Sequence, residues 1–450
     1  MSNANRSQIE DAIERQPFGA LQIRVVLLSA LVQAFDGFDL GTIGMAAPSL
    51  SKAWGVPPAE FTIAFVMSSV GILFGALLSG PLSDRFGRKP LLVLSVGLIG
   101  LFSTLSVFAW SVPSITALRF LTGLGIGGAM PVTVALTSDY SPLKRRGTLI
   151  MLMFCGNTLG GFLGGQLVAQ ILPIFGWHAI FLAGGIPPLV LLPFLVVFLP
   201  ESPRFLIAHR LDQPATQAIL RTLNIDAQTA APQLVDVART SPIAQLFSDG
   251  LAMSTILLWI AFFANLLNMY LFSYWMPTVL NLSGFKPETA VFYASMFQLG
   301  GILSISVLGP AIDRFGAPRV LACSFASGIA FIVAIGLLNL PAPYIALPIL
   351  GAGAAMIGSQ LGANAMAAGL YPARIRSTGV GWALGIGRLG GIAGPAIGGM
   401  LLALGLPPRE IFLCATGPAI VAAVATMFLT VKASTRHGDA AARGTQTRAA

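Results

Sequence analysis

Apolar tracts of about twenty residues recur along the chain, separated by short polar segments. A helical crossing of a bilayer needs about 20 apolar residues, whereas transmembrane strands are shorter and alternate in polarity. The pattern therefore predicts twelve transmembrane helices. To within a few residues they are expected at 24–47, 61–81, 90–110, 113–136, 148–172, 178–199, 252–280, 289–309, 319–340, 343–370, 377–404 and 410–432.

The composition agrees with a protein embedded in a lipid bilayer. The 450 residues are 55% hydrophobic and only 10% charged, with a mean hydropathy of +0.81. A soluble domain carries roughly 25% charged residues. We therefore expect an all-α integral membrane protein. The first twenty residues are polar and mixed in charge, unlike a secretory signal peptide, so we expect the N-terminus to stay in the cytoplasm.

The distribution of basic residues predicts the orientation in the membrane. Of 26 Lys and Arg, two fall within crossings (Arg119 and Arg388) and three on one side (Lys52, Lys286 and Arg409). The remaining 21 fall on the other side, which the positive-inside rule assigns to the cytoplasm. We expect a multi-pass protein of the inner membrane with both termini cytoplasmic. Because the basic clusters are short and scattered, the net charge of +9 does not indicate a nucleic-acid partner.

The two halves of the chain resemble each other. The segment "GPLSDRFGRKP" (80–90) recurs as "GPAIDRFGAPR" (309–319), and "RRGTLIMLMFCGNTLGG" (145–161) aligns with "IRSTGVGWALGIGRLGG" (375–391). The two offsets differ by one residue, which indicates a duplicated six-helix unit. Such repeats favour a substrate site near the midplane, between the halves.

One long polar segment divides six predicted crossings from six. The expected organisation is an N-terminal half with a cytoplasmic N-terminus (1–200), a cytoplasmic linker (201–250), and a C-terminal half with a cytoplasmic tail (251–450).

Neither a metal site nor a cofactor site is indicated. The histidines and cysteines are scattered and form no ligand motif: His178, His209, His437, Cys155, Cys323 and Cys414. The segment "GLGIGG" (123–128) fits a nucleotide-binding pattern literally, but it lies mid-helix with no strand before it. We expect no metal, no cofactor and no enzyme activity.

Four ionisable residues lie well inside the predicted crossings: Asp36, Asp39, Arg119 and Arg388. Each charge near the bilayer centre costs about 2.5 to 3.5 kcal/mol on insertion scales. Asp36 and Asp39 are three residues apart, which places both on one helix face. These groups must therefore pair, face water or take part in function.

We expect the aspartate pair to carry protons. The reference pKa of aspartate is about 3.9, so a proton carrier at neutral pH needs surroundings that favour the neutral acid. Our hypothesis is that one of the pair, Asp39 in preference to Asp36, takes up and releases the proton. Its partner is then held ionised by Arg119. The alternative is that two aspartates simply neutralise two arginines.

Arg388 lies in "GIGRLGGIAGP", a glycine-dense stretch with no acidic residue in its own helix. A guanidinium offers paired donors suited to a carboxylate, so we expect Arg388 to anchor an acidic substrate. A structural ion pair with Asp36 or Asp39 is the alternative. Neutral amides and aromatic rings are expected to contact the rest of the substrate. The alternative is that they only form hydrogen bonds between helices or pack against them. These candidates are Asn265, Asn268, Gln298, Gln360, Asn364, Phe35, Phe38, Tyr270, Tyr274 and Trp382.

The loop sequence Gly80-x-x-x-Asp84-Arg85-x-Gly87-Arg88-Lys89 resembles the signature of the major facilitator superfamily. A degenerate copy follows at Gly309, Asp313, Arg314 and Gly316, and "PESPRFL" (200–206) is a further match. The resemblance implies two six-helix halves, and a gating role at the cytoplasmic side for Gly80, Asp84, Arg85, Gly87, Arg88, Asp313 and Arg314. Asp139 departs from the family pattern, which has Glu there.

Within that superfamily, "DGFD" (36–39) and "YWMPTVL" (274–280) resemble the aromatic acid:proton symporters. The resemblance implies import of an aromatic carboxylate, of the benzoate, hydroxybenzoate or hydroxycinnamate kind, with protons and by alternating access. We expect a monomer whose partners are this acid, protons and the bilayer. Two alternatives stay open: a carrier of another organic anion or sugar, and a receptor that senses aromatic acids without transporting them.

Overall fold

A computed structural model describes residues 19–142, 145–203, 205–206, 243–248, 250–337, 340–372 and 375–429, without the side chain of Ser377. Most of the predicted linker and the predicted C-terminal tail lie outside these ranges.

Long helices follow one another along the described chain. In the first half they are α2 (Ala20–Trp54), η1 (Pro58–Phe61), α3 (Thr62–Phe86), α4 (Arg88–Leu105), η2 (Ser106–Phe108), α5 (Val112–Tyr140), α6 (Arg146–Phe175) and α7 (His178–Phe198). In the second half they are η3 (Ala244–Phe247), α10 (Ala252–Leu282), α11 (Pro287–Phe315), α12 (Ala317–Leu337), α13 (Ala346–Leu370), α14 (Arg376–Ala403), α15 (Pro408–Cys414) and α16 (Thr416–Met427).

Twelve of the described helical segments are long and apolar enough to cross a bilayer, as the sequence predicts. The last crossing consists of two helices, α15 and α16, which are separated at Ala415. Pro418 lies in the first turn of α16. Proline has no N–H to continue a preceding helix, so the break falls just before it.

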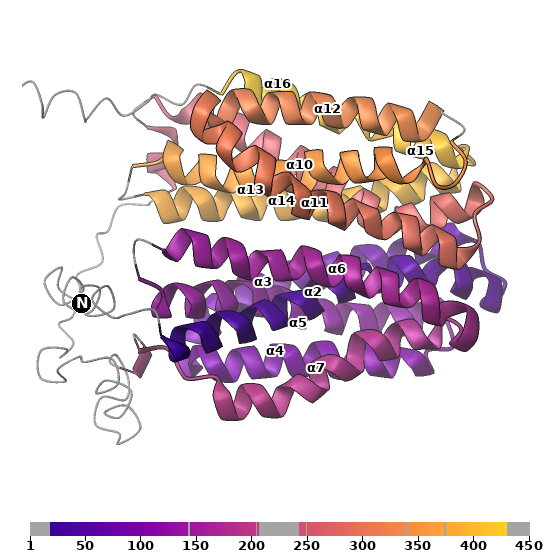
Figure 1. Cartoon of the computed structure of the whole chain (residues 1–450), viewed down its shortest axis with the longest axis horizontal. Helices are drawn as coiled ribbons and strands as arrows, with labels where there is room; N and C mark the ends of the chain where they lie inside the picture. Colours follow the sequence, from indigo (N-terminus) through magenta and orange to yellow (C-terminus); the bar gives the residue numbers. More distant parts are fainter. Residues whose placement is uncertain are drawn as a thin grey trace, which may run out of the picture.

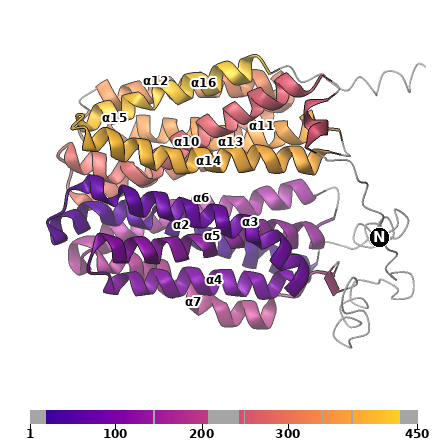
Figure 2. The ribbon, with the colours of Figure 1, turned by 180° about the vertical axis from the view of Figure 1, so that it is seen from behind.

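The helices form two bundles that lie side by side, α2 to α7 in one and α10 to α16 in the other (Figures 1 and 2). We call the end of the molecule where α2 begins and α7 ends the near end. The far end is where α2 ends and α3 begins. All helices run roughly between these two ends, as crossings of one membrane would.

Glycines bring helix backbones into contact within the first half. A Cβ atom added to Gly156 would overlap the carbonyl of Ala30, and one added to Gly160 would overlap the carbonyl of Ala34. These contacts join α6 to α2. Small residues at such spacing allow close helix packing in membranes. The glycine-rich sequence of α6 therefore fixes the position of α2, the helix that carries the two aspartates.

The halves touch at the far end and separate toward the near end. Gly381, Arg388 and Gly399 lie on one face of α14, since spacings of 7 and 11 residues return to within about 20° on a helix. At the far end a Cβ on Gly399 would overlap Thr62 of α3, whereas a Cβ on Gly381 would meet open space. Arg388, between them, reaches Met130 of α5.

Other contacts between the halves also lie away from the near end. A Cβ on Gly44 would lie 2.6 Å from the carbonyl oxygen of Tyr274, and the Tyr274 ring stacks on Phe65 at 5.1 Å. Gln166 donates a hydrogen bond of 2.6 Å to Ser295, joining α6 to α11. By contrast, Gly80 and Gly147, at the near ends of α3 and α6, face open space. The structure is therefore closed at the far end and open at the near end.

Candidate functional site

Asp39 and Arg119 form a buried ion pair inside the first half. The Arg119 Nη1 atom lies 3.2 Å from Asp39 Oδ2, and the two residues are 1% and 2% exposed respectively. Arg119 also donates to Thr42 at 3.0 Å and to Ser106 at 2.9 Å, and Ser103 donates to Asp39 at 2.6 Å. Each charge is thus compensated by the other and by hydroxyl groups of α2, α4 and η2.

This pairing corrects one expectation. We expected Arg119 to hold the partner of a titrating Asp39, but Arg119 binds Asp39 itself. The physical reason is the helix geometry: a three-residue spacing moves a side chain by about 4.5 Å along the axis and about 60° around it. Only Asp39 therefore reaches α5, and Asp36 is left one turn closer to the near end.

Asp36 is buried without a bonding partner. It is 4% exposed, and its carboxylate makes no hydrogen bond or ion pair with any other residue that the structure describes. The positive charge that acts on it belongs to Arg388 of α14, across the boundary between the halves. An unpaired carboxylate in an apolar interior is costly unless it takes up a proton or gains a partner.

Arg388 is likewise held by neutral groups. Its Nη1 donates to the Tyr270 hydroxyl at 2.7 Å, and its Nη2 lies 2.9 Å from the sulfur of Met130. Within the described ranges no carboxylate lies within ion-pair distance of it. Asp36 and Arg388 therefore carry opposite charges in different halves and are not directly paired.

Three of the predicted amides form one chain between α10 and α13. Asn265 donates both amide hydrogens, to the Met356 carbonyl at 3.1 Å and to Gln360 Oε1 at 2.8 Å. Gln360 in turn donates to Asn364 Oδ1 at 3.3 Å. The Asn265 Oδ1 atom is buried and receives no hydrogen bond. The chain ends in one free acceptor, on Asn265, and in amide hydrogens on Asn364.

Gln298 and Asn268 lie in different surroundings. Gln298 of α11 lies against Gly161 of α6, where the two halves meet, and makes no hydrogen bond with the rest of the described chain. Asn268 instead donates to the carbonyl of Ala415 at 3.0 Å. The structure therefore directs Asn268 toward the break between α15 and α16, away from Arg388.

Two of the predicted ring-stacking residues, Phe38 and Trp382, are not brought to Arg388. Phe38 is 5% exposed and packs against Gly164 of α6. Trp382 stacks on Trp259 with ring centroids 5.8 Å apart. Six residues separate Trp382 from Arg388, which places it about 120° away around α14. Tyr270, another of the predicted ring-stacking residues, accepts a hydrogen bond from Arg388.

The loop signature is organised around Glu201. Gly87, between α3 and α4, has φ +105°, a conformation that side-chain-bearing residues rarely adopt. This turn lets the N–H groups of Arg88 and Lys89 donate to the Glu201 carboxylate at 2.9 and 3.2 Å. A carboxylate at a helix N-terminus is stabilised by the helix dipole. The acidic residue of "PESPRFL" thus caps α4.

Arg88 also joins α4 to α5. Its guanidinium forms an ion pair with Asp139, and Ser202 donates to the same carboxylate at 2.5 Å. The aspartate that departs from the family pattern therefore reaches the loop arginine.

The other signature residues are not engaged across the halves. Gly80, Asp84, Arg85, Asp313 and Arg314 are exposed at the near ends of α3 and α11. Asp84 and Asp313 form no ion pair with any other described residue. Their lack of contact is consistent with the opening between the halves at this end. No three His, Cys, Asp or Glu side chains gather as metal ligands could in the described ranges.

Comparison with known proteins decides the family. The model of the Major Facilitator Superfamily matches residues 29–361 and 258–449. The chain belongs to the major facilitator superfamily. The resemblance stated from the loop signature is confirmed.

Relatives in this superfamily are named as transporters of aromatic acids. The chain is 38% identical to the 4-hydroxybenzoate transporter PcaK of Pseudomonas aeruginosa, over 97% of this chain and 98% of that protein. It is 39% identical to a gallate transporter of Pseudomonas putida, over 93% and 94%. The fold is similar to the inward open xylose transporter XylE from E. coli, with a TM-score of 0.71, 18% identity and coverage of 92% and 98%.

Proposed function

We propose that this protein imports an aromatic carboxylate of the benzoate, hydroxybenzoate or hydroxycinnamate class together with protons. It would do so as a monomer in the inner membrane, with both termini in the cytoplasm. The observation that carries the proposal is Arg388, a cation at the boundary of the halves that is held only by a hydroxyl and a thioether. The names of the relatives support the substrate class.

The anion would bind Arg388. A carboxylate is a much stronger acceptor for a guanidinium than the sulfur of Met130. The substrate carboxylate would therefore replace Met130, while the Tyr270 hydroxyl stays bonded to Arg388. Charge-assisted hydrogen bonds of this kind contribute about 1.5 to 3 kcal/mol net.

Binding of the anion would favour binding of a proton. In the empty protein the charge of Arg388 acts on the carboxylate of Asp36. Once a substrate anion neutralises Arg388, Asp36 would lose that favourable interaction, and binding of a proton to its carboxylate would cost less free energy. Because coupling between two binding events is reciprocal, a proton on Asp36 also favours the anion on Arg388. This arrangement makes Asp36, in preference to Asp39, our candidate proton carrier.

Asp39 and Arg119 would support the site without exchanging protons. Their ion pair is closed by Ser103, Thr42 and Ser106, and it fixes α2 against α5. Removing one member of a buried ion pair strongly destabilises the folded protein, because the other charge is left buried and uncompensated.

The amide chain would read the ring substituents. The orphan Asn265 Oδ1 atom suits an O–H donor, and the free hydrogens of Asn364 suit an acceptor. A ring hydroxyl offers both. This supports hydroxylated benzoates over unsubstituted ones.

The opening between the halves supports one stage of the proposed cycle. With the near end on the cytoplasmic side, the structure would correspond to an inward-open form, from which substrate would be released. Closing the near end and parting the far end would return the site to the outside, as alternating access requires.

Uptake into proteoliposomes tests the proposal. Purified protein would be supplied with labelled 4-hydroxybenzoate or gallate under an imposed pH gradient, acidic outside. We expect accumulation that a protonophore abolishes, and competition by benzoates but not by sugars or dicarboxylates. Accumulation of a sugar instead, or binding of an aromatic acid without any uptake, would favour the two alternatives stated from the sequence.

Arg388→Gln tests the anchor. We expect the apparent affinity for the acid to fall by about ten- to a hundredfold, the equivalent of the bonds lost. Arg409→Gln, an exposed arginine at the far end, is the matched control and should leave the affinity unchanged. Equal affinities of the Arg388 variant and the control would remove Arg388 from the site.

A further inference from the structure

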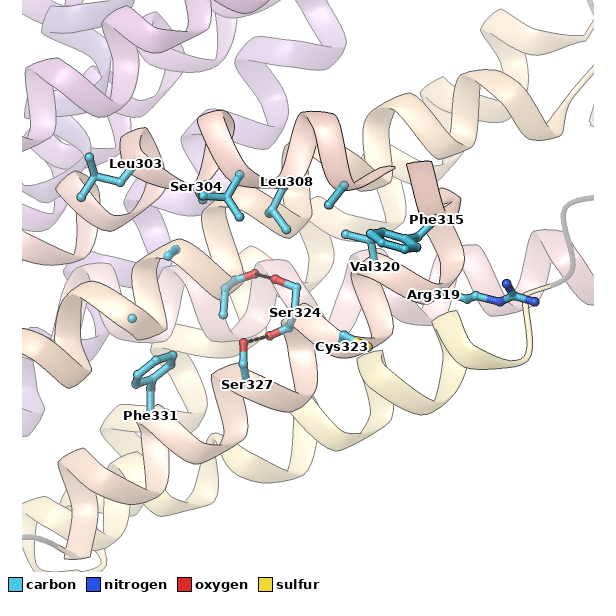
Figure 3. A pocket seen from close by; sticks show the side chains of 15 residues that line it. Leu303, Ser304, Leu308, Phe315, Arg319, Val320, Cys323, Ser324, Ser327 and Phe331 are labelled. Atoms are coloured by element: carbon cyan, nitrogen blue, oxygen red, sulfur yellow. Dashed lines mark hydrogen bonds between the residues drawn. The ribbon is translucent and has the colours of Figure 1, made fainter. Parts of the chain in front are cut away.

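A groove on the second half lies away from the candidate site. It has a volume of about 620 Å³ and runs between α11, α12 and α13. Figure 3 shows Leu303 and Leu308 on one side and Phe331 on the other. Its rim includes Val307 and Phe315, which are 68% and 57% exposed, so the groove opens onto the outer surface of the bundle.

The hydroxyl groups on the groove walls already have partners. Ser304 donates to the carbonyl of Gly301 at 2.6 Å, and Ser327 donates to the carbonyl of Ser324 at 2.7 Å. Ser324 donates to the carbonyl of Ala355 at 3.3 Å and accepts from Ser359 at 2.9 Å. Few polar groups remain for a polar solute, so the walls favour a hydrocarbon occupant.

One charge lies at the mouth of the groove. Arg319 is the charged residue among those that line it. It is exposed, and it makes no hydrogen bond or ion pair with the other residues that the structure describes. In Figure 3 its guanidinium points away from the serines, beyond Phe315 and Cys323. The mouth therefore favours an anion, and the interior favours an alkyl chain.

The length of the groove matches one leaflet. Arg319 and Phe331 are twelve residues apart on α12, which corresponds to about 18 Å along a helix. Half of the hydrocarbon core of a bilayer is about 15 Å thick. A lipid with its phosphate at Arg319 would therefore place its acyl chain end near Phe331, at mid-membrane.

We propose that this groove binds one anionic phospholipid, with its phosphate on Arg319 and one acyl chain between α11 and α12. The inference goes beyond transport and does not depend on it. Basic pockets between transmembrane helices suit anionic head groups. The bound lipid would stabilise the packing of α11 against α12 and α13. Gln298 lies on α11, and Gln360 and Asn364 lie on α13.

Native mass spectrometry of the full-length protein tests the proposal. Protein in mild detergent would be titrated with phosphatidylglycerol and, separately, with phosphatidylethanolamine that carries the same acyl chains. We expect one phosphatidylglycerol to bind with about fivefold preference, as one basic residue near the membrane surface provides. Arg319→Gln should remove this preference.

Two further variants separate a built site from general attraction. Arg314→Gln removes a neighbouring exposed arginine that does not line the groove, so it should keep the preference. Ala311→Phe should fill the chain space and weaken binding of both lipids. If Arg314→Gln lowers binding as much as Arg319→Gln does, or if Ala311→Phe binds like wild type, the proposal is overturned. Because no transport is measured, this outcome is independent of the proposed function.

Discussion

Two aspartates one helical turn apart meet opposite conditions in this protein. Asp39 has a cation and a hydroxyl group as direct partners, whereas Asp36 has no bonded partner among the described residues. The difference arises from which neighbouring helix each carboxylate faces. It is the basis of the roles that we propose, structural for Asp39 and proton-carrying for Asp36.

The first prediction concerns stability. Asp39→Asn leaves the Arg119 charge buried and unpaired, so we expect the protein to lose about 3 to 5 kcal/mol of stability. Asp36→Asn removes no direct bond and should be close to neutral. Thermal unfolding in detergent measures both variants. If they unfold at the same temperature, the difference in their roles is refuted.

The second prediction concerns coupling. Asp36→Asn cannot take up a proton, so we expect it to lose accumulation driven by a pH gradient. It should still exchange labelled for unlabelled acid across the membrane, because exchange needs no net proton movement. Asp36→Glu restores an ionisable group and serves as the control. Accumulation at the wild-type level by Asp36→Asn would exclude Asp36 as the proton carrier.

The sequence singled out the four buried charges as candidate groups, but it did not predict how they pair. Four charged residues in apolar segments stand out because burying a charge in a membrane is costly. Their partners come from other helices, and no local pattern encodes them. Met130 is one example: a methionine in an apolar helix has no signature that marks it as the neighbour of Arg388. The turn of Asn268 toward Ala415 is another, since it depends on the break before Pro418.

At the scale of helices, glycine determines how closely two elements approach. Gly156 and Gly160 set α6 directly on the backbone of α2, and Gly37 does the same from the α2 side, against Asn157. The position of α2 in turn determines where Asp36 and Asp39 lie. Helix packing and the electrostatics of the site are therefore linked through residues that carry no charge.

The third prediction tests this link. Gly160→Val would push the α2 backbone away at Ala34, and we expect a loss of about 1 to 3 kcal/mol, as for overpacked cores. Gly147→Val, on the same helix but facing open space, is the matched control and should be nearly neutral. Unfolding temperatures and uptake rates measure both. Equal unfolding temperatures would show that α2 can shift without cost.

The helices themselves were largely predictable. Tract length and hydropathy are local properties, so the twelve crossings follow from the sequence. The division of the last crossing does not follow from hydropathy, because an apolar tract runs through it. The orientation of Trp382 toward Trp259 also needed the structure, since helical spacing alone does not say which face meets a neighbour.

At the scale of the whole molecule, the two halves contact each other at the far end and are separated at the near end. The far end is closed by Tyr274, Phe65 and Ser68, and the near end is open beside Gly381. The repeat in the sequence indicates two similar halves, but it does not indicate which end is closed. In the proposed cycle that property would depend on the balance between two sets of contacts, only one of which is formed at a time.

The fourth prediction concerns two substitutions that should shift this balance in opposite directions. Gly44→Leu would collide with Tyr274 and disfavour far-end closure, whereas Gly381→Leu would place bulk in the near-end opening and disfavour closure there. We expect both variants to lose transport, but by trapping opposite states. A cysteine at Gly385, which also faces open space, reports on the near end in a background without Cys155, Cys323 and Cys414.

The reaction rate of that cysteine with a polar maleimide distinguishes the two variants. We expect slower labelling in Gly44→Leu and labelling at least as fast as in the parent in Gly381→Leu. Labelling at one rate in both would mean that neither glycine controls the opening.

The four ionisable groups inside the crossings also have an electrical consequence. Two carboxylates and two guanidiniums sum to zero, so in the proposed cycle reorientation without substrate would move no net charge. A load of one monoanion and one proton leaves the sum unchanged. Any steady current evoked by substrate would therefore report additional protons, each worth about 2.3 kcal/mol per 100 mV of membrane potential.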